Sequence, residues 1–223
     1  MKATSRAITM TLGAGILGAF FISNAVAGCG DLANLQGPFQ FADPDVVAQM
    51  LAPRMEGITS GQRDSESSQR GGGSGASIVG MWNFQFISMG NTGHSPSIPD
   101  GAVLDFGYQH WHSDGTEFVE SGGHPPAGAN FCLGVWGQTG YLTYEINHFP
   151  IAYDTSTGNI ANYINVREQL TLSPSGDRYS GTFTQDVYDT RGVHIDHVAG
   201  MVVATRITVD STLPSSIPGK LTQ

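Results

Sequence analysis

Eight short segments between residues 79 and 208 alternate apolar and polar residues with a period of two, the pattern of a β-strand buried on one face. Clusters of Gly, Pro, Asn, Asp and Ser separate the segments, and no convincing helical period runs through this region. Their number and even spacing predict an all-β domain, either a barrel or a sandwich. The predicted strands are 79–88, 102–112, 116–121, 130–137, 141–149, 160–172, 178–188 and 194–208.

The connections between these segments alternate in length. Tight turns are predicted at Asp114-Gly115, 137–140 and 174–176. The longer connections are 89–101, 122–129, 150–159 and 189–193. In an up-and-down meander, successive connections lie at opposite ends of the sheet. The alternation therefore predicts a single up-and-down eight-stranded antiparallel barrel, closed at one end and open at the other through a mouth of loops that binds a ligand.

The first and last predicted strands carry a tryptophan and an arginine that antiparallel closure brings together. Gly80-Met81-Trp82 opens the first strand, and Arg206 lies late in the last. This resembles the lipocalin pattern, in which a G-x-W tryptophan packs under a last-strand arginine. The resemblance covers residues 78–210 and implies a calycin-type barrel that binds a small molecule. The lipocalin loop motif and the long helix after the last strand are absent from the sequence.

A second resemblance is carried by the runs 111–117 (WHSDGTE) and 130–136 (NFCLGVW). These runs are similar to segments of exported bacterial proteins of unassigned function. This resemblance implies no activity.

Residues 1–27 have the organisation of a signal peptide. Lys2 and Arg6 form a basic start, an apolar stretch follows, and Ala25-Val26-Ala27 forms a small-residue cleavage site. The mature chain is therefore expected to be exported, to the periplasm or the outside of the cell.

Between the signal peptide and the barrel, two further segments are predicted. Residues 28–57 contain one short helix, started by Asp43-Pro44-Asp45, and residues 58–77 form a flexible Gly/Ser-rich linker. Residues 211–223, with two prolines, form a C-terminal tail.

The two cysteines leave two outcomes open. Val26-Ala27-Gly28-Cys29 resembles a bacterial lipobox, which implies acylation of Cys29 and a membrane-anchored lipoprotein. Cleavage after Ala27 instead leaves Cys29 free to form a disulfide with Cys132 in an oxidising compartment.

The charge balance restricts the partners. The formal net charge is −9, and the chain has 10 Lys and Arg against 19 Asp and Glu. Binding to a phosphate backbone needs a basic face, so nucleic acid is excluded as a partner. Membrane contact is expected only through an acylated Cys29. No nucleophile elbow, phosphate loop, dinucleotide fingerprint or zinc helix is present in the sequence, so no cofactor is predicted and binding is favoured over catalysis.

Candidate ligand contacts follow from assigning the inward face of each strand by its apolarity. Several polar residues fall on these inward faces, where each needs a partner. We expect them to converge with apolar neighbours at the mouth and to bind a small, partly apolar molecule. The predicted polar contacts are Tyr144, His148, Gln185 and His197, and the predicted apolar contacts are Phe106, Ile146, Phe183 and Met201.

Three alternatives accompany this prediction. Eight-stranded barrels of the allene oxide cyclase type perform cyclisations and isomerisations, which implies His148 or Glu168 as a general acid or base. A histidine metal site is the second alternative: the order His110-x-His112-x4-Glu117 is similar to the first metal motif of cupins, and further histidines lie in the mouth loops. The third is a structural module displayed on a membrane.

Overall fold

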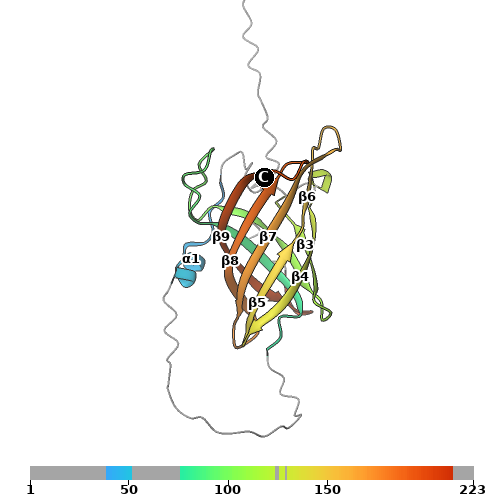
Figure 1. Cartoon of the computed structure of the whole chain (residues 1–223). Helices are drawn as coiled ribbons and strands as arrows, with labels where there is room; N and C mark the ends of the chain where they lie inside the picture. The colour runs from blue at the N-terminus through green and yellow to red at the C-terminus, as the bar shows by residue number, and fades with distance from the viewer. Residues whose placement is uncertain (1–38, 52–75, 124–125, 129, 213–223) are drawn as a thin grey trace, which may run out of the picture.

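The computed structural model of the chain describes residues 39–51, 76–123, 126–128 and 130–212 (Figure 1). The predicted signal peptide, Cys29, the linker over 58–75 and the tail from residue 213 lie outside the described residues. Among the residues that are described, no helix is both long and apolar enough to cross a membrane.

Nine strands form one antiparallel sheet, in the order β5-β4-β3-β2-β1-β9-β8-β7-β6. Because β5 also pairs with β7, eight of these strands close into a barrel, and the three-residue β6 lies outside the closure as an extra arm on β7. The predicted eight-stranded antiparallel barrel is therefore confirmed. The strands are β1 Gly80–Ser88, β2 Val103–Trp111, β3 Thr116–Ser121, β4 Phe131–Gly140, β5 Thr143–His148, β6 Ile151–Tyr153, β7 Ile160–Leu172, β8 Arg178–Tyr188 and β9 His194–Ile207. The helical elements are α1 Pro44–Leu51 and the short 3-10 turn η2 Pro126–Gly128.

The two ends of the barrel differ as the loop lengths predict. Short hairpins close the lower end in Figure 1, and longer loops surround the upper end. One turn is displaced from its predicted position: β4 continues through 137–140, and the chain reverses at Tyr141-Leu142. Leu142 takes the left-handed conformation there, with φ of 56°. The predicted long connection at 150–159 contains β6.

The predicted contact between Trp82 and Arg206 is present at the closed end. The two residues are direct partners in the β1–β9 ladder, and the Arg206 guanidinium lies 4.1 Å from the centre of the Trp82 ring. Gly80 makes room for it, because a Cβ there would lie 2.7 Å from Arg206 Nη1. Arg206 also donates hydrogen bonds to the carbonyl oxygens of Val79 and Gly176. The arginine thereby ties the start of β1 to the β7–β8 turn.

The segment before α1 attaches to the mouth end of β2. Phe41 forms a bridge with Ala102, and the amide of Val103 donates to the carbonyl of Gln40 over 2.7 Å. The helix α1 then begins at Pro44, where the Asp43 side chain accepts a hydrogen bond from the amide of Asp45. An N-cap carboxylate followed by proline is a common helix start, so this helix begins as its sequence predicts.

The inward faces agree with the sequence prediction on three strands and disagree on two. On β5, β7 and β8 the predicted residues are buried inside the barrel. On β2 the polar residues Asp105 and Gln109 point inward with Trp111, and on β9 the inward residues are Val198, Gly200, Val202 and Ala204. The prediction had the opposite face of β9 inside, and on β2 it had the opposite face inside from Phe106 onward, whereas Leu104 is buried as predicted. Apolarity could not decide them, because the outer faces of β2 and β9 also carry apolar side chains.

Candidate functional site

Three charged side chains from three strands meet inside the barrel. Glu117 on β3, His148 on β5 and Glu168 on β7 are each at most 2% exposed. We call these three residues the interior cluster. Each is on the inward face of its strand by simple alternation with its exposed neighbours. Buried charges are rare unless they are paired, so the cluster is a candidate functional site.

A glycine between Glu117 and His148 lets them meet. Gly134 on β4 is the ladder partner of both Glu117 and His148, so the three residues lie side by side on three adjacent strands. A Cβ at position 134 would lie 2.6 Å from Glu117 Oε2 and 3.2 Å from His148 Nδ1. The missing side chain is therefore the space through which Glu117 reaches across β4 to the histidine.

Each ring nitrogen of His148 faces a carboxylate. His148 Nε2 lies 2.6 Å from Glu168 Oε1, within a hydrogen bond, and Nδ1 lies 2.9 Å from Glu117 Oε2. The second contact is close, but it lacks the alignment of a hydrogen bond, because both of its atoms have no hydrogen-bond partner among the described residues. We treat it as an ion pair. An imidazole that faces carboxylates at both nitrogens is best stabilised with both nitrogens protonated.

The electrostatics agree with a protonated histidine. Burial lowers the pKa of His148, but the two neighbouring glutamates outweigh it and raise that pKa from 6.5 to about 10. Burial raises the pKa of Glu168, partly offset by its hydrogen bond to His148. The cluster therefore holds an imidazolium, and Glu168 is a weaker acid than an exposed glutamate.

Two further polar side chains extend the interior cluster. Gln109 Nε2 donates to Glu168 Oε1 over 3.4 Å, and the Tyr179 hydroxyl donates to Gln109 Oε1. Burial raises the pKa of Tyr179 well above 10, and the nearby carboxylates raise it further. Tyr179 thus stays a neutral hydrogen-bond donor.

The carboxylates of the interior cluster are incompletely hydrogen bonded. Glu117 Oε1, Glu117 Oε2 and Glu168 Oε2 are buried and have no hydrogen-bond partner among the residues that the structure describes. A buried acceptor without a donor costs about 1–3 kcal/mol, and more when it is charged. Such atoms are often explained by a bound water, ion or ligand or by a catalytic role.

A second buried acid lies nearer the mouth. Asp105 is four residues from Gln109 along β2, roughly 13 Å at the usual rise of a strand. Its Oδ1 accepts hydrogen bonds from the Ser121 hydroxyl over 2.6 Å and from the amide of Phe106 over 2.8 Å, whereas Oδ2 has no partner in the described part of the chain. Burial raises the pKa of Asp105 to about 7, although these hydrogen bonds oppose it.

The predicted ligand contacts divide between the two sides of the barrel wall. Tyr144, Ile146, His148, Phe183 and Gln185 are all buried in the interior, on their predicted faces. Phe106, His197 and Met201 lie on the outer face, so the prediction that they point inward is wrong. These residues belong to β2 and β9, the two strands whose faces the sequence prediction reversed.

The cupin-like residues are not brought together. Glu117 points into the barrel, whereas His110 on the neighbouring strand is exposed outside it. The His110 and His112 rings lie 4.2 Å apart, centre to centre, but the three side chains form no metal-binding group among the described residues. The cause is strand alternation: His110 pairs with Phe118, whose side chain lies on the opposite face of β3 from that of Glu117.

Cys132 is buried on the inward face of β4 and is disulfide-bonded. The other cysteine in the prediction, Cys29, lies outside the described residues, so its acylation stays a prediction.

The sequence prediction did not anticipate the set of contacts inside the barrel. His148 and Glu168 were placed inside, but Glu117 was assigned to another site, and Gln109, Asp105 and Gly134 were not singled out. The signal for Glu117 was present in the alternation of β3, where Glu117, Val119 and Ser121 share one face.

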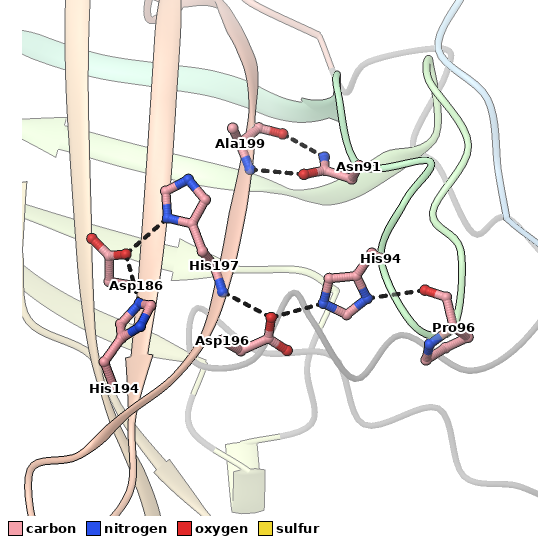
Figure 2. Close-up of polar contacts among 8 residues, drawn as sticks. All are labelled: Asn91, His94, Pro96, Asp186, His194, Asp196, His197 and Ala199. Atoms are coloured by element: carbon pink, nitrogen blue, oxygen red, sulfur yellow. Dashed lines mark hydrogen bonds and ion pairs between the residues drawn. The ribbon is translucent and has the colours of Figure 1, made fainter.

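A different group of titratable side chains lies outside the barrel at the mouth end. Asp186 on β8 contacts both His194 and His197 of β9, and Asp196 contacts His94 of the β1–β2 loop (Figure 2). The sequence prediction offered a histidine metal site at the mouth as an alternative, but it expected His197 in the interior and did not include Asp186.

No protein-family model matches the chain, and no curated protein or solved structure matches it significantly.

Proposed function

We propose that the barrel binds a small, partly apolar molecule that donates hydrogen bonds, such as an amine or an alcohol with an apolar body. The observation that carries this proposal is a pair of buried carboxylate oxygens inside the barrel, Glu117 Oε1 and Glu168 Oε2, which have no hydrogen-bond partner among the described residues. A ligand N–H or O–H would satisfy these acceptors and remove the cost of leaving them unpaired.

The charge of the interior cluster favours the same class of ligand. Glu117 and Glu168 carry two carboxyl groups against the single positive charge of His148. A ligand with a carboxylate would bring a further negative charge into a site of low dielectric, which is costly, whereas an ammonium or a neutral hydroxyl would not. The residues next to His148 on the inward faces of β5 and β7, Ile146 and Val166, are apolar and suit the apolar part of the ligand.

A second candidate function is acid–base catalysis, and Asp105 favours it. A catalytic acid or base works best when its pKa lies near the working pH, and burial places the pKa of Asp105 at about 7. His148, with its pKa near 10, would serve as a proton donor rather than a base. In this alternative the barrel isomerises or cyclises the molecule that it binds, as eight-stranded barrels of the allene oxide cyclase type do.

Export also belongs to the proposal. The basic start, apolar stretch and small-residue site of residues 1–27 support it. Membrane attachment through acylation of Cys29 would need a free thiol there, and the disulfide at Cys132, the one other cysteine of the sequence, favours secretion over attachment.

Thermal unfolding of the purified chain tests the binding proposal. The probes are two matched series: benzylamine, benzyl alcohol and benzoate, and octylamine, octanol and octanoate. A ligand at one hundred times its Kd stabilises the folded state by about 2.7 kcal/mol, which raises Tm by several degrees. We expect amines or alcohols to raise Tm and the matched carboxylates to leave it unchanged.

Substitutions locate the effect. Glu117→Gln should abolish the stabilisation, and Glu120→Gln should retain it, because Glu120 is exposed on the other face of the same strand. The proposal is wrong if no amine or alcohol raises Tm, if the carboxylates act equally, or if Glu117→Gln responds like the native chain. Mass spectrometry of the recovered probe separates the two functions: a chemically altered compound that Asp105→Asn leaves intact would favour the enzyme.

A further inference from the structure

We propose that Asp186, His194 and His197 form a binding site for a divalent transition-metal ion on the outer wall of the barrel, at its mouth end. Among the described residues these three side chains offer ligand atoms that all lie within 4.8 Å of one another. The site is separate from the interior cluster and does not depend on the function proposed for it.

A β-bulge creates this group. Asp186 is the direct ladder partner of His197, and the next pairs are Val187 with Asp196 and Tyr188 with His194, so β9 contains one extra residue at this point. Residues three apart on a regular strand point to opposite faces of the sheet. The extra residue at Ile195 cancels that alternation and places both histidines on the outer face, beside Asp186.

The separations between the ligand atoms are close to those of a metal site. Asp186 Oδ1 lies 3.0 Å from His194 Nε2 and 2.8 Å from His197 Nδ1. Around a tetrahedral ion with bonds of about 2.1 Å, neighbouring ligand atoms are about 3.4 Å apart. The two contacts to Asp186 Oδ1 therefore need to lengthen by roughly half an ångström to admit an ion, and both rings already face this same carboxylate oxygen (Figure 2). The nitrogen atoms that the two histidines offer lie within 4.8 Å of each other.

Neighbouring contacts hold the group in place. The Tyr188 ring packs edge-on against the His194 ring, with centres 5.3 Å apart. Asp196 Oδ1 accepts the amide of His197 over 2.7 Å and also contacts His94 Nε2 at 2.8 Å (Figure 2). Ligand side chains that are oriented by such contacts lose less freedom when the ion binds.

The turn between β8 and β9, next to the site, contains an arginine that is paired with an aspartate of the same turn. In the turn between β8 and β9, Asp189 accepts hydrogen bonds from the amides of Arg191 and Val193 and pairs with the Arg191 guanidinium at 2.7 Å. The positive charge of Arg191 is thus neutralised by Asp189. With neutral imidazoles, Asp186 gives the group a negative charge, which suits a cation.

Two imidazoles and one carboxylate select the class of metal. This donor set suits zinc, cobalt, nickel, copper or iron, whereas magnesium and calcium prefer sites made of oxygen atoms alone. The side chains of His194 and His197 are about half exposed, at 48% and 50%. An ion held there keeps positions open to water or to a further ligand, as in zinc sites with three protein ligands.

The test is a titration of the untagged, metal-stripped full-length chain with Zn²⁺ by calorimetry, and with Co²⁺ by visible absorption. We expect one ion per chain at the site. His194→Gln, His197→Gln and Asp186→Asn should each weaken its binding at least tenfold, since the loss of even an outer contact to a metal ligand costs 10–100-fold.

The double variant His110→Ala/His112→Ala is the matched control, because it removes two neighbouring histidines from the opposite end of the barrel and should bind the ion like the native chain. Near-UV circular dichroism verifies that each variant is folded. The proposal is overturned if the native chain binds no Zn²⁺ up to millimolar concentration, if folded variants of the three residues bind it unchanged, or if the control loses it.

Discussion

The proton on His148 should be retained far above the pH at which an ordinary histidine loses it. Its pKa is raised from 6.5 to about 10 in the folded chain. The corresponding stabilisation is fully present below pH 6.5 and is lost as the pH rises through 10, because the unfolded chain releases this proton first. The difference of 3.5 pKa units is equivalent to about 5 kcal/mol in total.

Between pH 7 and pH 9 the free energy of unfolding should fall by about 2–3 kcal/mol, because the folded state holds one proton more than the unfolded state across this range. Urea unfolding followed by tryptophan fluorescence measures this decrease. Nitrogen NMR of the imidazole provides a direct readout: both ring nitrogens should remain protonated at pH 9.

The variant Glu117→Gln provides the comparison. It removes one of the two charges that hold the proton, so the ring should lose its proton at a lower pH than in the native chain. Exposed Glu120→Gln should leave the titration unchanged. A native ring that titrates near pH 6.5, or a free energy of unfolding that is flat from pH 7 to pH 9, would refute the ion-paired cluster.

Three further substitutions test other parts of the structure. Trp82→Ala should lower the free energy of unfolding by more than about 3 kcal/mol, because it removes a fully buried aromatic ring from the closed end; a loss below about 1 kcal/mol in urea unfolding would contradict this packing. Gly134→Ala should lower the free energy of unfolding by about 2 kcal/mol or more, because its Cβ would displace the Glu117 carboxylate. Gly137→Ala on the same strand is the control and should be tolerated, because a Cβ there meets nothing within 4 Å. Equal stabilities of the two variants would disprove the role of Gly134. Asp105→Asn should stabilise the chain at pH 8 but much less at pH 4. The pKa of the Asp105 carboxyl is raised to about 7 in the folded chain, so the free energy of unfolding of the native chain falls by up to about 4 kcal/mol as the pH rises from 4 to 7. Urea unfolding at pH 4 and pH 8 measures the difference in stability between the variant and the native chain. The same difference at both pH values would contradict this reasoning.

Several features of the barrel could be predicted because their signals are local. Strand limits follow from alternation and turn residues, and the helix at Pro44 follows from its capping sequence. The Trp82–Arg206 contact was predictable because antiparallel closure leaves one place where the first and last strands can meet. The inward faces of β5, β7 and β8 were predictable because one face of each is clearly the more apolar.

The reversed faces of β2 and β9 show where this reasoning stops. Asp105 and Gln109 are buried despite their polarity because partners on other strands satisfy them, such as Ser121 and Tyr179. A sequence pattern records the polarity of a side chain but not the partner that compensates for its burial. For β9, both faces carry apolar residues, so alternation alone allowed either assignment.

The chemistry of both candidate sites was decided by the tertiary structure. His148 and Glu168 were predicted to lie inside, but their contact with Glu117 requires the β5–β7 closure and the absence of a side chain at Gly134. The outer group of Asp186 and two histidines requires a bulge of one residue in β9, and no Gly, Pro or Asn in this part of β9 indicates the bulge in the sequence. The sequence by itself determined the strands and their order, because these depend on neighbours along the chain. Which side chains meet was decided only in the folded barrel, because register, bulges and strand closure depend on contacts between residues far apart in the chain.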